Sequence, residues 1–249
     1  QGLCKTLNEA LELWSGMYFQ LTACGDILLP AKLSIQVEKI QQLDQDHGLV
    51  YSDVGIMDDE SSKLKLTFYQ ESNYIPKSGD LYLEQARRQF IKFVSCLCVT
   101  EYLKKINGFD ESLAFEDVDF FLRFSKHFKF EYMDDLTCYW RKHEDNMTDL
   151  LYINVKYLES RLIAYNKQVG ANKEIDKILK PKLIKILKLL YKNKRILKIK
   201  FNIRKSFFEV VVDILRDCVR IRKHLISRRQ QVFSKNVKPA ETKFILLPG

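Results

Sequence analysis

The alternation of helical and strand patterns in the first part of the chain constrains its fold more than any other feature. Apolar residues recur at helical spacing over 3–15 and over 30–43. Each of these stretches is followed by a short run with strand character, at 17–21 and at 49–53, and a further such run covers 90–100. Such alternation is typical of layered α/β folds. The sequence therefore predicts an α/β fold for this region.

The composition is that of a globular chain with one substantial core. Of its 249 residues, 46% are hydrophobic and 29% are charged, and the uninterrupted apolar runs are far shorter than a membrane span requires. The six cysteines show no CxxC pair and no regular spacing, which disfavours a zinc ribbon and a disulfide scaffold. These features predict a globular protein in a reducing, cytoplasmic environment.

Charge divides the chain into two parts. Residues 1–150 contain 16 Lys and Arg against 25 Asp and Glu, whereas residues 151–249 contain 25 against seven. A split of this kind indicates two regions with different partners. We predict a body at 1–149 and a basic helical region at 150–249.

The basic region contains three stretches with helical spacing, near 150–163, 178–190 and 207–219. In the last two, an apolar stripe is flanked by lysine or arginine. Such helices can lie on an anionic membrane surface, here through 175–230. Alternatively, they pack their stripes against each other or against the body, with the lysines in solvent. Nucleic acid is not expected as a partner, because aromatic residues are not interleaved with the basic ones as in a recognised module.

Carboxylates stand at the start of a predicted apolar and aromatic helix. Glu116, Asp117 and Asp119 occupy its first turn, where the helix dipole favours negative charge. Taken alone, this cluster is better explained as an ordinary solvated helix start. Its meaning depends on the sequence around it.

Several further blocks accompany the acidic cluster in a fixed order. They are the stretch from Gly2-Leu3 through Asn8-Glu9-Ala10-Leu11, Gly16-x-Tyr18-Phe19 and Asp26-Ile27-Leu28-Leu29-Pro30, then Val50-Tyr51-Ser52-Asp53, Asn107-Gly108-Phe109-Asp110-Glu111-Ser112, Phe115-Glu116-Asp117-Val118-Asp119-x-x-Leu122-Arg123 and Tyr139-x-Arg141-x-His143. In this order and spacing, the chain resembles the second half of the family-two glycosyltransferases, nucleotide-sugar enzymes of the GT-A fold. The resemblance covers residues 1 to about 149.

The resemblance implies a truncated GT-A body, because the nucleotide-binding half of the family would precede Gln1, followed by the α-helical basic region at 150–249. It implies a non-processive, inverting transfer of a sugar from a nucleotide-sugar to a glycan or lipid-linked acceptor, in surface polysaccharide biosynthesis. The enzyme would work in the cytoplasm or at the inner face of the membrane. An inactive remnant, acting as a membrane-associated or protein-interaction module, is the alternative.

The resemblance also implies roles for individual residues. Asp117 would take the acceptor proton in a single displacement, and Glu116 would help to place the acceptor. The stretch Gln85-Ala86-Arg87-Arg88-Gln89 is faintly similar to the QxxRW motif of processive synthases, but it precedes the acidic cluster and lacks the Trp. The substrate-binding residues implied are Asn8, Asp26, Asp53, Asp119 and Arg123. For Arg123, an ion pair with a carboxylate is the favoured alternative.

The implied metal ligands for Mg²⁺ or Mn²⁺ are Asp26 and His143. The usual family pattern is Asp-x-Asp-Asp, whereas this chain has Ala23-Cys24-Gly25-Asp26, so two of the three acids are missing. Cys24 is a soft ligand and a poor substitute for an aspartate. A divalent-cation site and a turn aspartate with a surface histidine are therefore both open.

Overall fold

The computed structural model describes residues 2–142 and 154–192. All of these residues belong to one compact unit. His143 and the basic helix predicted near 207–219 lie outside the described residues.

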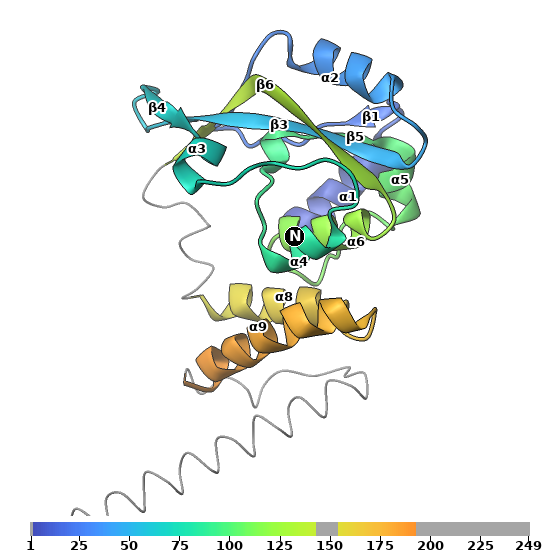
Figure 1. Cartoon of the computed structure of the whole chain (residues 1–249), viewed down its shortest axis with the longest axis vertical. Helices are drawn as coiled ribbons and strands as arrows, with labels where there is room; N and C mark the ends of the chain where they lie inside the picture. The colour runs from blue at the N-terminus through green and yellow to red at the C-terminus, as the bar shows by residue number, and fades with distance from the viewer. Residues whose placement is uncertain (1, 143–153, 193–249) are drawn as a thin grey trace, which may run out of the picture. The chain divides into compact units, whose positions relative to one another are not determined.

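A mixed six-stranded sheet forms the centre of the body (Figure 1). Its strands are β1 (Tyr18–Phe19), β2 (Ile27–Leu28), β3 (His47–Met57), β4 (Lys63–Thr67), β5 (Leu97–Val99) and β6 (Lys129–Arg141). Their order is β1-β5-β3-β6-β2, and β4 pairs with β3. The long strands β3 and β6 are parallel, and the other pairs are antiparallel. With the helices between the strands, this arrangement confirms the predicted mixed α/β class.

Helices cover both faces of the sheet. They are α1 (Leu3–Leu13), α2 (Lys32–Gln41), α3 (Phe68–Ser72), α4 (Tyr82–Arg87), α5 (Thr100–Lys105), α6 (Asp117–Ser125), α8 (Val155–Asn166) and α9 (Lys173–Lys192). Helix α2 lies on one side of the sheet, and α1, α4 and α6 lie on the other (Figure 1). The predicted helices at 3–15 and 30–43 are therefore present, with ends within a few residues of the prediction.

Helix α6 is anchored by aromatic side chains. Its residues Phe120, Phe121 and Phe124 are fully buried in the main core. The ring of Phe93, from the segment before β5, lies 4.7 Å from the centroid of Phe120 and 4.8 Å from that of Phe121. Burial of each such ring contributes about 1.5–3 kcal/mol. This packing fixes the start of α6, where the acidic cluster stands.

Helix α2 turns a different side to the sheet from the one that its sequence predicts. We expected Leu33 to share a buried apolar face with Val37 and Ile40, but Leu33 is 48% exposed, and Lys32 and Gln36 are buried instead. The reason lies in backbone carbonyl groups of the segment before β5, which accept hydrogen bonds from the helix. Gln36 Nε2 donates to Ser95 O at 2.7 Å, and Lys32 Nζ donates to Cys96 O at 3.5 Å and to the Gln36 side chain.

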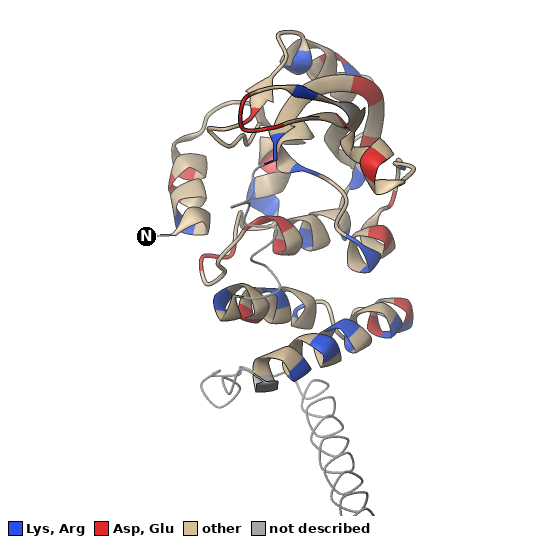
Figure 2. Cartoon of the chain, turned by 90° about the vertical axis from the view of Figure 1, so that its left-hand side faces the viewer, with Lys and Arg blue, Asp and Glu red and all other residues tan. Residues whose placement is uncertain are grey.

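Helices α8 and α9 pack on each other, and they also contact α6 and α4 respectively. The stripe of α9 is buried, and its members are Ile175, Leu179, Leu183, Ile186, Leu187 and Leu190. Basic residues lie along the outside of both helices (Figure 2). Over the described part of 175–230, the stripe is therefore packed against protein. Nowhere in 2–142 or 154–192 is a helix both long and apolar enough to cross a membrane.

Candidate active site

The acidic pair Glu116–Asp117 stands where α6 begins. Asp117 is the first residue of the helix, and its Oδ1 accepts a hydrogen bond from Val118 N at 2.6 Å. Glu116 occupies the N-cap position without a capping hydrogen bond from its side chain. Because Phe115 and Val118 on either side are buried, the two carboxyl groups are held at the edge of the core rather than in bulk water.

The environment separates the acidities of the two carboxyl groups. Burial raises the pKa of both, and the negative charge of Asp117 raises the pKa of Glu116 further. The Val118 N–H, Lys92 and Arg161 act in the opposite direction on the pKa of Asp117. Groups that interact this strongly lose their protons in two steps. The pKa of both carboxyl groups is therefore raised, and Asp117 is the one with a hydrogen-bond donor and nearby cations that favour its charged form.

A cavity of about 380 Å³ adjoins Asp117. It is lined by Phe68, Arg87, Arg88, Gln89, Phe90, Ile91, Lys92, Asp117, Val118, Arg161, Tyr165 and Lys182. Among these described lining residues, five are basic and one is acidic. A pocket of this size with a perturbed carboxyl group and a few convergent polar groups is the usual form of a binding or catalytic site.

Lys92 connects two of the predicted site residues. Its Nζ lies 3.9 Å from the ring centroid of Trp140 and 5.1 Å from that of Phe68, so aromatic faces orient the ammonium group. The charge of Lys92 acts to lower the pKa of both Asp26 and Asp117. The fold thus brings the turn before β2 and the start of α6 within the electrostatic reach of one cation.

Helices α8 and α9 contribute two further cations. Lys182 Nζ donates to Ala86 O at 2.7 Å and to Arg87 O at 2.6 Å, at the end of α4. Burial, together with the charge of Arg161, lowers the pKa of Lys182 to about 8. The candidate site is therefore completed by the region that the sequence assigned to a separate basic segment.

Asp26 is held at the sheet edge by β6. Its Oδ1 accepts from Arg141 N at 3.1 Å, and burial raises its pKa. The Arg141 guanidinium ties the same turn to the loop after β3, with bonds to Gly25 O at 3.0 Å and Asp58 O at 2.8 Å. Arg141 belongs to the motif that carried the resemblance, and here it positions Asp26.

The side chains near Asp26 decide whether the implied divalent cation can bind there. In the described ranges, 2–142 and 154–192, no three His, Cys, Asp or Glu residues are grouped as metal ligands. Asp26 offers one carboxylate, already bonded to Arg141 N, and Cys24 is exposed. His143 lies outside the described residues. These described residues do not fit a metal centre.

Asp119 and Arg123 form an ion-pair network that does not line the Asp117 cavity. Arg123 Nε lies 2.7 Å from Asp119 Oδ2, and Lys167 Nζ lies 2.7 Å from Asp119 Oδ1. The Arg123 guanidinium also donates to Gly108 O at 2.7 Å. Asp119 is only 1% exposed. The structure thus places this pair between α6, α8 and the turn after α5, outside the residues that line the Asp117 cavity.

Asn8 lies at the same turn and also outside the cavity lining. Its Nδ2 donates to Phe109 O at 2.8 Å, and its Oδ1 accepts from Phe109 N at 2.9 Å. Gly108 has φ +59°, and a Cβ there would lie 2.5 Å from Asn8 Oδ1. The close contact between α1 and this turn therefore requires glycine.

Asp53 supports the cavity indirectly. Its Oδ1 accepts from Val54 N at 2.7 Å and from Tyr69 N at 3.4 Å, in the first turn of α3. The preceding residue, Phe68, lines the cavity. Among the predicted site residues in 2–142 and 154–192, only Asp117 lines the cavity. Lys92, which also lines the cavity, acts on Asp26 through its charge.

Sequence reasoning missed Lys92, Arg161 and Lys182. Arg88 lines the cavity and lies in the Gln85–Gln89 stretch, which is faintly similar to the QxxRW motif, so a signal existed for that position. The other three come from a strand-like run and two basic helices, where nothing in the local sequence distinguishes them from solvated charges.

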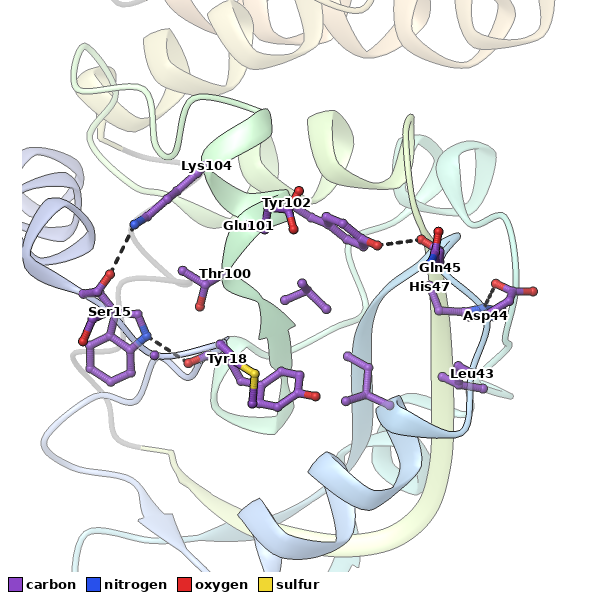
Figure 3. Close-up of a pocket in the computed structure, with 15 residues that line it drawn as sticks. Ser15, Tyr18, Leu43, Asp44, Gln45, His47, Thr100, Glu101, Tyr102 and Lys104 are labelled. Carbon is purple, nitrogen blue, oxygen red and sulfur yellow. Dashed lines mark hydrogen bonds and ion pairs between the residues drawn. The ribbon is translucent and has the colours of Figure 1, made fainter.

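A larger cavity, of about 540 Å³, lies between the end of α1, α5 and the loop before β3 (Figure 3). Its polar groups already bond one another: Tyr102 Oη donates to Gln45 O at 2.9 Å, and Lys104 Nζ donates to Trp14 O at 3.2 Å. Asp44 contacts His47 Nδ1 at 2.7 Å and is exposed to solvent. The smaller Asp117 cavity is therefore the better candidate for an active site.

No protein-family model matches the chain. Over 124 residues it is 27% identical to an uncharacterized glycosyltransferase of Rickettsia typhi, and the match covers 49% of this chain and 39% of that protein. The chain thus spans well under half the length of this relative.

Two solved structures also match. One is S. aureus TarS in complex with UDP-GlcNAc, with a TM-score of 0.49 and 14% identity, covering 87% of this chain and 60% of that chain. The other is a mannosyltransferase from Pyrobaculum calidifontis in complex with GDP-Man and Mn²⁺, with a TM-score of 0.48 and 14% identity, covering 79% and 55%. At these scores, neither match defines the activity of this chain.

Proposed function

We propose that the chain is part of a glycosyltransferase that moves a sugar from a nucleotide-sugar donor to an acceptor hydroxyl, with Asp117 as the base. The observation that carries the proposal is the Asp117 carboxyl group in a cavity lined by cations, with Glu116 next to it at the start of α6. A base must be ionised and within reach of the hydroxyl that it deprotonates. The sequence similarity to a glycosyltransferase supports the same reaction class.

The reaction would be a single displacement. The acceptor oxygen forms a bond to the anomeric carbon while the bond from that carbon to the diphosphate breaks, and the hydroxyl proton passes to Asp117. The electron pair of the broken bond leaves with the nucleoside diphosphate. Because attack and departure occur on opposite faces, the anomeric configuration inverts. Glu116, the neighbour of Asp117 in the chain, would help to place the acceptor by a hydrogen bond to its hydroxyl groups.

Lys92 supports an assignment of sides within this site. Its charge acts on both Asp117, which we assign to the acceptor side, and Asp26, which we assign to the donor side. A positive charge there would stabilise the negative charge that develops on the leaving diphosphate. On this assignment, Lys92 stabilises the diphosphate, and no metal ligand is required from the described residues.

The finer features stay part of the proposal. They are a GT-A body that begins upstream of this chain, a non-processive mode, a glycan or lipid-linked acceptor, a role in surface polysaccharide biosynthesis and work at the inner face of a membrane. The boundary between a body at 1–149 and a basic region at 150–249 is proposed in the same way.

A second candidate is an inactive remnant that acts as a membrane-associated or protein-interaction module. Ala23 and Gly25 stand where the resembled family has acids, and the one remaining acid of that turn, Asp26, is bonded to Arg141 N. These two facts favour loss of a donor site. The buried stripe of α9 argues against membrane binding through the apolar face of that helix.

Release of nucleoside diphosphate from a panel of UDP- and GDP-sugars, with and without acceptor extracts, tests the proposal. We expect acceptor-dependent release, absent from an Asp117→Asn variant purified in parallel, and an NMR spectrum of the product with inverted anomeric configuration. Retained configuration would contradict the single displacement. Absence of release with every donor would favour the remnant.

A further inference from the structure

The packed helices α8 and α9, here called the α8–α9 pair, meet two separate walls of the Asp117 cavity. Helix α9 contacts α4, which leads into the lining residues at 88–92 (Figure 1). Helix α8 contacts α6, whose first residue is Asp117. Because the two walls belong to different segments, their contacts with the α8–α9 pair bear on how they face each other.

Lys182 of α9 closes the end of α4. This helix has only six residues, and a helix of that length is marginal without tertiary contacts. The last carbonyl groups of a helix have no partner inside it. Lys182 Nζ donates to two of them, Ala86 O at 2.7 Å and Arg87 O at 2.6 Å. A cation of α9 thus fixes the point at which the chain leaves α4 and enters the cavity wall.

The other end of α4 is held by the same pair of helices. Tyr82, the first residue of α4, donates a hydrogen bond from Oη to Gln168 Oε1 at 2.9 Å. Both side chains are buried, and Gln168 lies in the turn between α8 and α9. Both ends of this short helix are therefore tied to the α8–α9 pair.

Ser160 of α8 holds the segment that enters α6. Its Oγ accepts from Ala114 N at 2.8 Å, and Ser160 is buried, so water does not compete for this bond. At the next residue, the ring of Phe115 stacks on that of Tyr157 in α8, with the centroids 5.9 Å apart. The acidic pair follows directly in the chain, so α8 fixes the backbone that carries it.

We propose that Ser160 and Lys182 are positioning residues of the active site, through which the α8–α9 pair sets the two walls of the Asp117 cavity against each other. The inference rests on the proposed function, because it takes Asp117 as the base and Lys92 as the cation for the leaving diphosphate. Reacting groups must be held within a narrow range of distances, and a misplacement of about 1 Å can cost about a hundredfold in rate. The α8–α9 pair would then contribute to the reaction through the walls that it holds.

Steady-state kinetics of nucleoside diphosphate release by the whole chain test this role. Lys182→Met should lower kcat by about tenfold or more and change the KM of donor and acceptor by less than about threefold, because a wall moves while substrate contacts remain. Lys182→Arg should restore most of kcat, since a guanidinium group can also donate to two carbonyl groups. Ser160→Ala should lower kcat in the same way. Thermal melting of each variant checks that it folds.

Lys185→Met is the matched control, since Lys185 is an exposed lysine of the same helix outside the cavity lining. We expect it to leave kcat and KM unchanged. Equal losses in Lys182→Met and Lys185→Met would overturn the inference. A raised KM with unchanged kcat in Lys182→Met would also overturn it, because Lys182 would then bind substrate rather than position a wall.

Hydrogen exchange measures the positioning without an activity assay. The backbone amide of Arg88 donates to Glu84 O at 2.9 Å, at the end of α4, and we expect its exchange to be faster in Lys182→Met. Ser160→Ala should speed exchange of the Ala114 amide, which loses its acceptor. Each variant should leave the other wall unchanged, and unchanged exchange in both variants would overturn the inference.

The two readouts separate this inference from the proposed function. Release that is unchanged in Lys182→Met and Ser160→Ala overturns the inference and leaves the proposed function intact. Absence of release from the wild type overturns the proposed function, and exchange then decides alone. Faster exchange at the expected wall in each variant supports the positioning role, whereas unchanged exchange overturns it.

Discussion

The Asp117 cavity and the cavity between α1 and α5 differ in the surroundings of their ionisable groups. The larger one, about 540 Å³, contains Asp44 and His47, which pair with each other in contact with solvent. The smaller one, about 380 Å³, holds Asp117 where burial raises its pKa, together with five basic residues in its lining. A buried carboxyl group with a raised pKa is a stronger indication of an active site than the volume of a cavity.

Asp119 and Asp117 allow a first test of this contrast, because one carboxylate has all its charge balanced and the other faces a cavity. Asp119→Asn leaves Lys167 and Arg123 without their shared counter-charge. We expect a loss of about 3–5 kcal/mol in the free energy of unfolding, measured by urea titration. Asp44→Asn is the control and should leave the midpoint unchanged. A loss of less than 1 kcal/mol for Asp119→Asn would contradict the buried network.

Lysines from the two cavities give a second test. Lys92→Met should slow release of nucleoside diphosphate by roughly a hundredfold. The substitution removes the positive charge that acts on Asp26 and Asp117 and keeps an apolar side chain of similar length. Lys104→Met removes a lysine from the larger cavity and should change the rate by less than about twofold, since it only donates to Trp14 O. Equal effects of the two substitutions would break the comparison.

Lys32 tests the cost of a buried cation that faces no cavity. It is 1% exposed, and burial lowers its pKa to about 8. Below pH 8 it is charged in the folded state at a cost, so Lys32→Met should stabilise the protein by about 2 kcal/mol there. Between pH 8 and the unfolded value of 10.5, the unfolded wild type binds more protons, so the penalty fades and the advantage of the variant should shrink. An advantage that grows over this range would contradict the assignment.

His47→Gln should have the smallest effect. Its partner Asp44 is exposed. The hydrogen bond from His47 therefore lowers the pKa of a carboxyl group that water already solvates. We expect no measurable change in the thermal midpoint or in the rate of release. A clear loss of activity would show that the larger cavity takes part in the reaction.

Local patterns were sufficient for much of the fold. The helices over 3–15 and 30–43 and the strand over 49–53 follow from periodicity, because each spans enough residues to show its spacing. The buried face of α2 did not follow, because it is set by the carbonyls of Ser95 and Cys96, which the helix meets only in three dimensions. Periodicity cannot register a polar partner of this kind.

The candidate site was predictable only where one segment carries it. Glu116 and Asp117 are adjacent in the sequence, so their motif could be recognised directly. Lys92, Arg161 and Lys182 come from three segments that are distant in the sequence and meet only when α8 and α9 pack on α6 and α4. Their role depends on burial and on proximity to Asp117, and neither property is encoded locally.

The most direct test of the account compares Asp117→Asn with Asp44→Asn in one assay of nucleoside diphosphate release. Loss of a general base lowers a rate by about 10²–10⁴-fold. We expect a loss in this range for Asp117→Asn and an unchanged rate for Asp44→Asn, with both variants folded by circular dichroism. A wild-type rate in Asp117→Asn, or a large loss in Asp44→Asn, would contradict the claim that sugar transfer occurs in the Asp117 cavity.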